Sequence, residues 1–224
     1  MEGPRLRILQ LLQKNGPYTV DGLAKAIGLA PATIRRHLDI LQRDRLVAFK
    51  QVRKKTGRPE YSFYLTDYGQ EALPKDYDKL LGMFVRELSA LDAKEIEDRN
   101  GYQVLELVCQ RLSAEVSRSY SAELVGKALG RRLATLIGHL ESEDFSPEAD
   151  VVDGSIQIKL HNCPFRSVAL QNKAVCAFDF GLVSSFLELD IEREECIHDG
   201  DSGCTYRADI AQSDEKQLVE AMSA

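Results

Sequence analysis

The sequence predicts an α+β fold with a helical N-terminal domain ending in a β-hairpin, a helical middle segment, and a C-terminal α+β domain. Apolar residues recur at helical spacing in the first 45 residues, and "LVAFKQVRKKTGRPEYSFYLT" alternates as strands do. The charge also changes sign along the chain. Residues 1–75 hold 14 Lys and Arg against 7 Asp and Glu, whereas the remainder holds 15 against 28. A basic front and an acidic rear are typical of a nucleic-acid-binding module joined to a domain that does not bind nucleic acid.

Three helices are expected before the hairpin. The first ends at Gly16-Pro17, because this dipeptide stops a helical pattern. The second has Thr19 as its N-cap and is closed by Gly28. The third starts at Pro31, a residue that suits the first turn of a helix. Its buried face is expected to consist of Ile34, Leu38 and Leu41.

Three helices and a basic hairpin form the plan of a winged helix-turn-helix. In that plan the third helix enters the major groove, where arginine can make two hydrogen bonds to a guanine edge. The residues expected to contact DNA are Thr33, Arg35, Arg36 and His37 on the third helix and Arg53, Lys54, Lys55 and Arg58 at the hairpin tip. The alternative is a solvated basic face on a winged helix that binds another protein.

Two stretches of this region carry a resemblance. "TIRRHLDILQRDRLV" and "TGRPEYSFYLTDYG" resemble the DNA-binding half of bacterial repressors in the broad arsenical-resistance and deoxyribose-operon-type classes. The resemblance implies binding to double-stranded operator DNA as a symmetric homodimer. We therefore expect a DNA-binding domain over residues 1–75, a linker or dimerisation helix over 76–100, and a sensor domain over 101–224.

The middle of the chain reads as helical. An apolar stripe is expected to consist of Tyr77, Leu80, Leu81, Phe84, Leu88 and Leu91. This stripe either docks on its own domain or forms part of a subunit interface. Helices are also expected around Val104–Val116 and over 122–140, followed by an acidic connector, "ESEDFSPEADVVDG". Cys109 lies between Leu105 and Leu112 at helical spacing and is expected to fill the core.

Four further cysteines lie in the last quarter of the chain. Their spacing is C-x12-C-x19-C-x7-C, which lacks the short C-x2-4-C pairs of a contiguous zinc knuckle. A strand is expected before Cys163, a helix near Cys176, and two strands whose connecting turn is flanked by Cys196 and Cys204. Three interpretations stay open on spacing alone: small core residues, a structural zinc site, or an iron–sulfur cluster held by thiolates.

A second resemblance bears on these thiols. Cys163-x12-Cys176-x27-Cys204, with "NCPF" and "GDSGC" around the outer two, is similar to the iron–sulfur-sensing repressors of the Suf cluster-assembly operon. It implies that these three cysteines ligate a [4Fe–4S] or [2Fe–2S] cluster. Cys196 is the candidate fourth ligand, with His161 and His198 as neighbours that could substitute. The terminal segment also resembles vinyl-reductase-type small-molecule-binding domains, which implies zinc beside an apolar ligand pocket as the alternative.

Other classes of protein are disfavoured. The N-terminal stretch lacks the pattern of a signal peptide and no run reaches the roughly 18 apolar residues of a membrane span, so a cytoplasmic location without membrane partners is expected. Clustered cysteines there favour metal or redox chemistry over disulfides. No catalytic triad order, phosphate-binding glycine loop or zinc-protease motif is present, so an enzyme is not expected.

Overall fold

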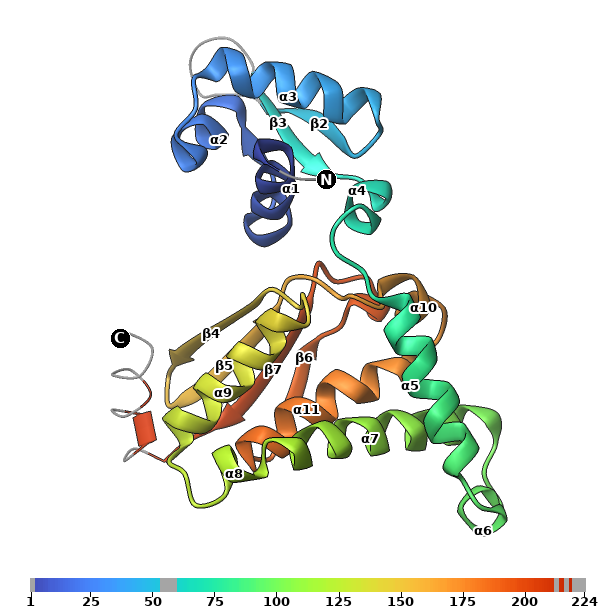
Figure 1. Cartoon of the computed structure of the whole chain (residues 1–224). Helices are drawn as coiled ribbons and strands as arrows, with labels where there is room; N and C mark the ends of the chain where they lie inside the picture. Colours follow the sequence, from blue (N-terminus) through green and yellow to red (C-terminus); the bar gives the residue numbers. More distant parts are fainter. Residues whose placement is uncertain (1–2, 53–59, 212–213, 216–217, 219–224) are drawn as a thin grey trace. The chain divides into compact units, whose positions relative to one another are not determined.

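The computed structural model describes residues 3–52, 60–211, 214–215 and 218 of the chain. It divides into two units, residues 1–75 and 76–224, each with its own hydrophobic core (Figure 1). The predicted α+β class is confirmed, with a winged helix-turn-helix at the N-terminus and a sheet domain after it. In the described part of the chain, no helix is both long and apolar enough to cross a membrane.

The first unit begins with three helices, as expected. They are α1 (Pro4–Asn15), α2 (Val20–Ile27) and α3 (Pro31–Arg43). The Thr19 hydroxyl accepts a hydrogen bond from the backbone N–H of Gly22, and Gly28 closes α2 in the left-handed region at φ 78°. The expected inward face of α3 is also confirmed, because Ile34, Leu38 and Leu41 are buried.

A three-stranded antiparallel sheet completes the first unit. Strand β2 (Val47–Val52) pairs with β3 (Glu60–Leu65), which also pairs with the short β1 (Tyr18–Thr19). The tip residues 53–59 lie outside the described residues. The last described pair of the hairpin is Val52 opposite Glu60. A short helix, α4 (Asp67–Glu71), follows β3 and is capped by the Thr66 side chain.

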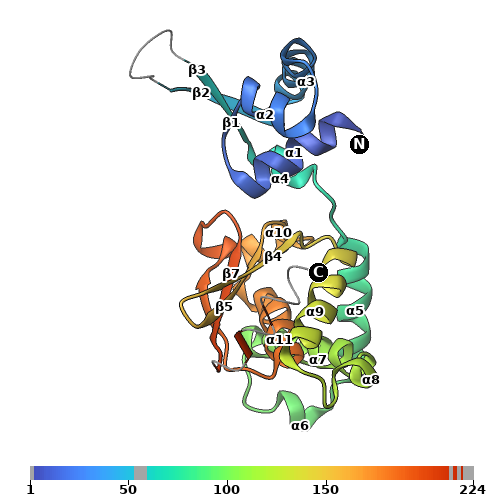
Figure 2. The same cartoon turned by 90° about the vertical axis from the view of Figure 1, so that its left-hand side faces the viewer.

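The second unit is built on a four-stranded antiparallel sheet of order β4-β5-β7-β6. Its strands are β4 (Pro147–Val152), β5 (Ser155–Leu160), β6 (Glu192–Glu195) and β7 (Cys204–Asp209). On β5, Ile156, Ile158 and Leu160 are buried at every second position, which is the pattern of a sheet with one face in the core. Figure 2 shows the helices gathered on one side of this sheet.

Seven α-helices are described in the second unit. They are α5 (Tyr77–Ala90), α6 (Ala93–Ile96), α7 (Gly101–Ser119), α8 (Ser121–Leu124), α9 (Leu129–Ser142), α10 (Arg166–Gln171) and α11 (Ala177–Leu187), and the 3-10 turns η1 (Lys173–Cys176) and η2 (Ile197–Asp199) accompany them. Helix α11 packs against both α7 and α9 (Figure 1). Cys109 on α7 is fully buried in this core, as predicted.

Three features differ from the sequence predictions. The segment expected as an acidic connector contains β4, which pairs along its whole length with β5. The helix expected over 122–140 is interrupted after α8, where Gly126 adopts φ 68° before α9 begins. The apolar stripe of α5 is divided, because Leu80 is buried whereas Leu81 and Leu88 are exposed.

Candidate functional site

The first candidate site is the outer face of α3. Thr33, Arg35 and Arg36 are exposed, as the sequence predicted. At about 100° per residue, Arg36 points almost directly away from the buried face of the helix. His37 lies at the boundary of that face: it is half-buried and its Nδ1 atom is buried without a hydrogen-bond partner among the described residues. His37 is therefore less exposed than Thr33, Arg35 and Arg36, and its contact with DNA stays a prediction.

The sequence interpretation missed Arg43 on the same helix. Arg43 is exposed and lies seven residues, or about two turns, after Arg36, so both side chains line the same outward face. The seven-residue spacing between Arg36 and Arg43 was the sequence signal that could have identified it. The other predicted DNA contacts, Arg53, Lys54, Lys55 and Arg58, lie outside the described residues.

The second candidate site is formed by cysteines of the second unit. Cys176 ends η1, Cys196 follows β6, and Cys204 begins β7; all three are 3–4% exposed. Their thiols meet, since Cys176 and Cys204 both hydrogen-bond to Cys196. We call these three residues the thiol cluster. The structure thus brings together three of the four cysteines that the sequence singled out.

The fourth cysteine lies on an adjoining segment. Cys163 is partly buried between β5 and α10 and packs against the core of the second unit. Strand β5 is the neighbour of β7, and Leu160 at its end lies opposite Cys204. The segment that carries Cys163 therefore leaves the sheet beside the thiol cluster.

The thiol cluster has an uneven charge distribution. The hydrogen bonds from Cys176 and Cys204 lower the pKa of Cys196, and a backbone hydrogen bond at His198 acts in the same direction. The pKa values of Cys176 and Cys204 are raised, first by their hydrogen bonds to Cys196 and then by burial. Cys196 is therefore the first of the three to exist as a thiolate, with the other two thiols as donors.

Three polar side chains that the sequence interpretation missed surround the cluster. Asp179 is buried on α11, where burial raises its pKa, and its carboxylate accepts a hydrogen bond of 2.5 Å from the hydroxyl of Tyr206. Arg193 donates to the backbone carbonyl of Cys176, and its guanidinium lies over the ring of Tyr206. Burial opposes the charge on Arg193, but Tyr206 and Asp179 nevertheless hold its pKa above the usual value.

The two nearby histidines already have polar partners. The Nδ1 atom of His198 lies 2.8 Å from the carbonyl oxygen of Ala169, so Nδ1 carries the proton and Nε2 has the free lone pair when the ring is neutral. The Nε2 atom of His161 lies 2.8 Å from Glu148. A ligand role for either histidine would have to use its other nitrogen.

The chemistry of the thiol cluster suits a metal, but its arrangement is not set for one. Thiolates are the ligands that zinc and iron–sulfur clusters use. Among the residues that the structure describes, however, no three His, Cys, Asp or Glu side chains are placed so that they could hold a metal ion. Ligation would require the thiols, which now contact one another, to rearrange.

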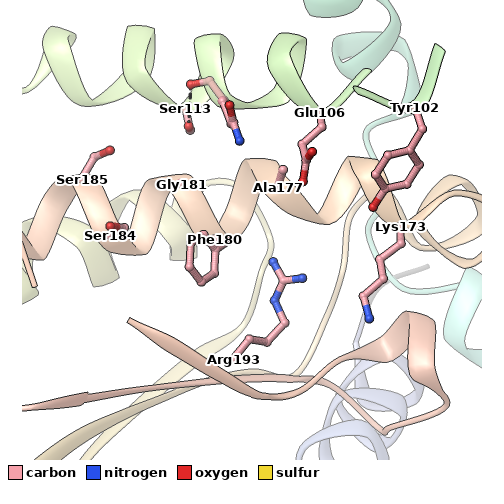
Figure 3. A pocket seen from close by; sticks show the side chains of 11 residues that line it. Tyr102, Glu106, Ser113, Lys173, Ala177, Phe180, Gly181, Ser184, Ser185 and Arg193 are labelled. Carbon is pink, nitrogen blue, oxygen red and sulfur yellow. Dashed lines mark hydrogen bonds between the residues drawn. The ribbon is translucent and has the colours of Figure 1, made fainter. Parts of the chain in front are cut away.

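A cavity of about 480 Å³ lies next to the cluster, between α7, α11 and β6 (Figure 3). Lys173, which lines it, belongs to the same 3-10 turn as Cys176, and Ala177 begins α11 directly after that cysteine. Arg193 contributes to both places, since it lines the cavity and bonds to Cys176. The cavity and the thiol cluster therefore share structural elements.

Comparisons with known proteins bear on the first unit. Residues 4–48, from α1 to the start of β2, match the family model described as "Bacterial regulatory protein, arsR family". Over these residues the N-terminal unit is similar to the winged-helix domains of that family. The chain is thus a transcriptional regulator of the DNA-binding, winged-helix type. The match does not extend to the second unit.

Two other comparisons add no functional argument. A structure of Bacillus subtilis PadR in complex with operator DNA is similar at 16% identity, covering 81% of this chain and 94% of that chain with a TM-score of 0.29. No curated protein matches the chain.

Proposed function

We propose that the chain is a homodimeric repressor that binds double-stranded operator DNA and holds an iron–sulfur cluster through Cys163, Cys176, Cys196 and Cys204. The observation that carries this proposal is the thiol cluster, in which cysteines from three separate segments meet in a buried place. A [4Fe–4S] or [2Fe–2S] cluster would supply a redox-sensitive group there. By the resemblance in the sequence, the cluster-loaded protein represses and loss of the cluster releases the operator.

The DNA-binding step is assigned to α3 and the hairpin. Arg36 and Arg43 project outward from α3, where guanidinium groups can reach base edges and phosphates in the major groove. Thr33 and Arg35 flank that line of arginines. The basic residues of the hairpin tip would add contacts to the DNA backbone.

A route from the cysteines to the DNA-binding unit is available at Pro164. Its carbonyl, one residue after Cys163, accepts a hydrogen bond from the backbone N–H of Asp76, the first residue after the winged-helix unit. The hydroxyl of Tyr77 accepts a second bond from the backbone N–H of Ser167 on α10. Movement of Cys163 on ligation would therefore act on the start of α5, directly after the DNA-binding unit.

The dimer interface is assigned to the exposed apolar face of α5. Leu81, Val85 and Leu88 are 64%, 55% and 44% exposed and lie at helical spacing on one face. The adjoining face, which carries Leu80, packs against the core of the second unit. A second copy of α5 would cover an apolar stripe of the same shape, as a two-fold symmetric interface requires.

One observation favours a second candidate function, a winged-helix regulator with a structural zinc site that senses a small ligand. Four thiolates at about 2.3 Å around one tetrahedral ion are about 3.8 Å apart, which is the spacing of sulfurs in contact. A cluster instead places several metal ions between its ligands. Cys176 and Cys204 each interact with Cys196, so the three thiols would need a smaller rearrangement to surround one ion than to surround a cluster.

Metal analysis after anaerobic purification distinguishes the two. Iron and acid-labile sulfide in similar amounts, with visible absorbance, are expected for the cluster, and zinc without sulfide for the alternative. Replacing any one of the four proposed ligands with alanine should remove the metal. The matched control is Cys109→Ala, which removes a buried thiol that lies on α7, outside the thiol cluster. Colourless, zinc-free protein after a reconstitution attempt would contradict both.

The coupling route has its own test. Tyr77→Phe removes the hydroxyl that bonds to Ser167 without touching a cysteine. The variant should keep the wild-type metal content, while the difference in DNA affinity between the loaded and metal-free protein shrinks. An unchanged difference would exclude this route.

A further inference from the structure

The cavity beside the thiol cluster has the size and lining of a small-molecule site. Its volume of about 480 Å³ falls in the range of ligand pockets. One wall comes from α7, with Tyr102, Glu106 and Ser113, and the other from α11, with Phe180 and Ser184. Figure 3 shows Arg193 extending from its strand toward α11, near Phe180. The lining is mixed, with polar and charged side chains beside apolar ones.

Arg193 is the most distinctive group in this lining. Its Nη2 donates to the carbonyl of Cys176, but its Nε is buried without a partner among the described residues. The charge of buried Asp179 acts on Arg193, and nearby Lys173 is paired with Asp199 at 2.7 Å. Its guanidinium also lies 5.3 Å from the centre of the Phe180 ring. An arginine that lines a cavity beside an aromatic ring is suited to a planar anion.

We propose that this cavity binds a small anionic ligand with a flat body, whose carboxylate or phosphate group pairs with Arg193 and whose ring packs beside Phe180. The half-buried serines of α11 and Glu106 on the facing wall supply hydrogen-bond partners for the rest of the ligand. The proposal goes beyond DNA and cluster binding and depends on neither. Because Arg193 also holds the carbonyl of Cys176, an occupant of the cavity would contact a group that positions the thiol cluster.

Calorimetric titration of the full-length protein with three probes tests the proposal. Benzoate and phenyl phosphate present the two kinds of anion on the same ring, and benzamide presents that ring without a charge. We expect at least one anion to bind with a Kd of about 1 mM or below, and benzamide to bind at least about tenfold more weakly. Stronger binding of one anion identifies the group that the natural ligand carries.

Two variants and a control complete the experiment. Arg193→Lys keeps the charge but removes the planar fork, and should weaken anion binding about tenfold. Ser184→Leu fills the cavity from α11 without altering Arg193, and should abolish binding. Arg118→Lys, on the exposed end of α7 outside the cavity, should bind as the wild type does. Circular dichroism would verify that each variant is folded.

The outcomes separate clearly. Binding of neither anion to the wild-type protein, or equal binding of benzoate and benzamide, would overturn the proposal. Unchanged anion affinity in folded Ser184→Leu would place the ligand elsewhere and overturn it too. Since the titration needs neither DNA nor metal, its failure would leave the proposed cluster and operator functions untouched.

Discussion

The contact between α7 and α11 allows one substitution to be worked out in detail. An added Cβ at Gly181 would lie 2.9 Å from the Cβ of Ser113 and even closer to its hydroxyl oxygen. Carbon atoms do not approach so closely, so Gly181→Ala must push the two helices apart. Overpacking of this kind costs about 1–3 kcal/mol, against a gain of about 1 kcal/mol from the better helix propensity of alanine.

The expected net loss for Gly181→Ala is about 0–2 kcal/mol of unfolding free energy. For a chain of this size that lowers the Tm by up to about 8 °C. The matched control is Gly138→Ala on α9, where the added Cβ meets nothing within 4 Å and the Tm should rise by about 2–4 °C. Thermal melts followed by circular dichroism measure both.

A double variant tests the cause of the effect. Ser113→Gly removes both atoms that the new Cβ would meet, so in a double-mutant cycle it should relieve part of the cost of Gly181→Ala. If Gly181→Ala raised the Tm as Gly138→Ala does, or if the cycle showed no coupling, the close approach of α7 and α11 would not be the controlling feature.

Three further predictions concern DNA, assembly and pH. Arg36→Ala should weaken duplex DNA binding about tenfold and flatten its salt dependence, whereas exposed Arg131→Ala on α9 should not; fluorescence anisotropy at several salt concentrations measures both. Leu81→Asp should convert dimer to monomer in sedimentation velocity, and a persisting dimer would exclude the α5 face. Burial lowers the pKa of His139 below 6.5, so the folded protein binds fewer protons than the unfolded chain and stability falls as pH drops below about 6.5. The difference between the unfolding free energies at pH 7.5 and pH 5.5, measured with urea, should be smaller for His139→Gln than for the wild-type protein.

The first unit could be predicted from the sequence because its signals are local. The Thr19 cap, Gly28 and Pro31 each act within a few residues, and all three perform the expected role in the structure. Strand β4 was missed because it lies in an acidic stretch, with Glu148 and Asp150 among its own residues, and its stability comes from pairing with β5. A signal was present nevertheless: Asp153-Gly154 has φ of 51° and 74°, the turn that an Asp-Gly pair favours between antiparallel strands.

The cysteines could be singled out from the sequence, but their surroundings could not. The meeting of Cys176, Cys196 and Cys204 depends on how η1 is placed against β6 and β7, which is a tertiary property. The same placement brings Arg193 and Asp179 to the cluster, and neither belongs to a sequence motif. The division of α5 into a buried and an exposed face likewise depends on which side the core occupies.

The charge of the thiol cluster explains why a bound cation would alter this unit. Without a metal, Cys196 can carry a negative charge because two neighbouring thiols donate to it and Arg193 lies nearby. A metal needs its ligands deprotonated, which removes those S–H donors and leaves several thiolates near buried Asp179. Arg193 would balance part of that charge and the metal the rest, so we expect the loaded and empty states to differ in the positions of η1 and the β6–β7 connection. Of the proposed ligands, Cys163 is the one next to Pro164, whose carbonyl is bonded to Asp76 at the boundary of the DNA-binding unit. A structural change at the thiols that also moved Cys163 would therefore reach that boundary through Pro164.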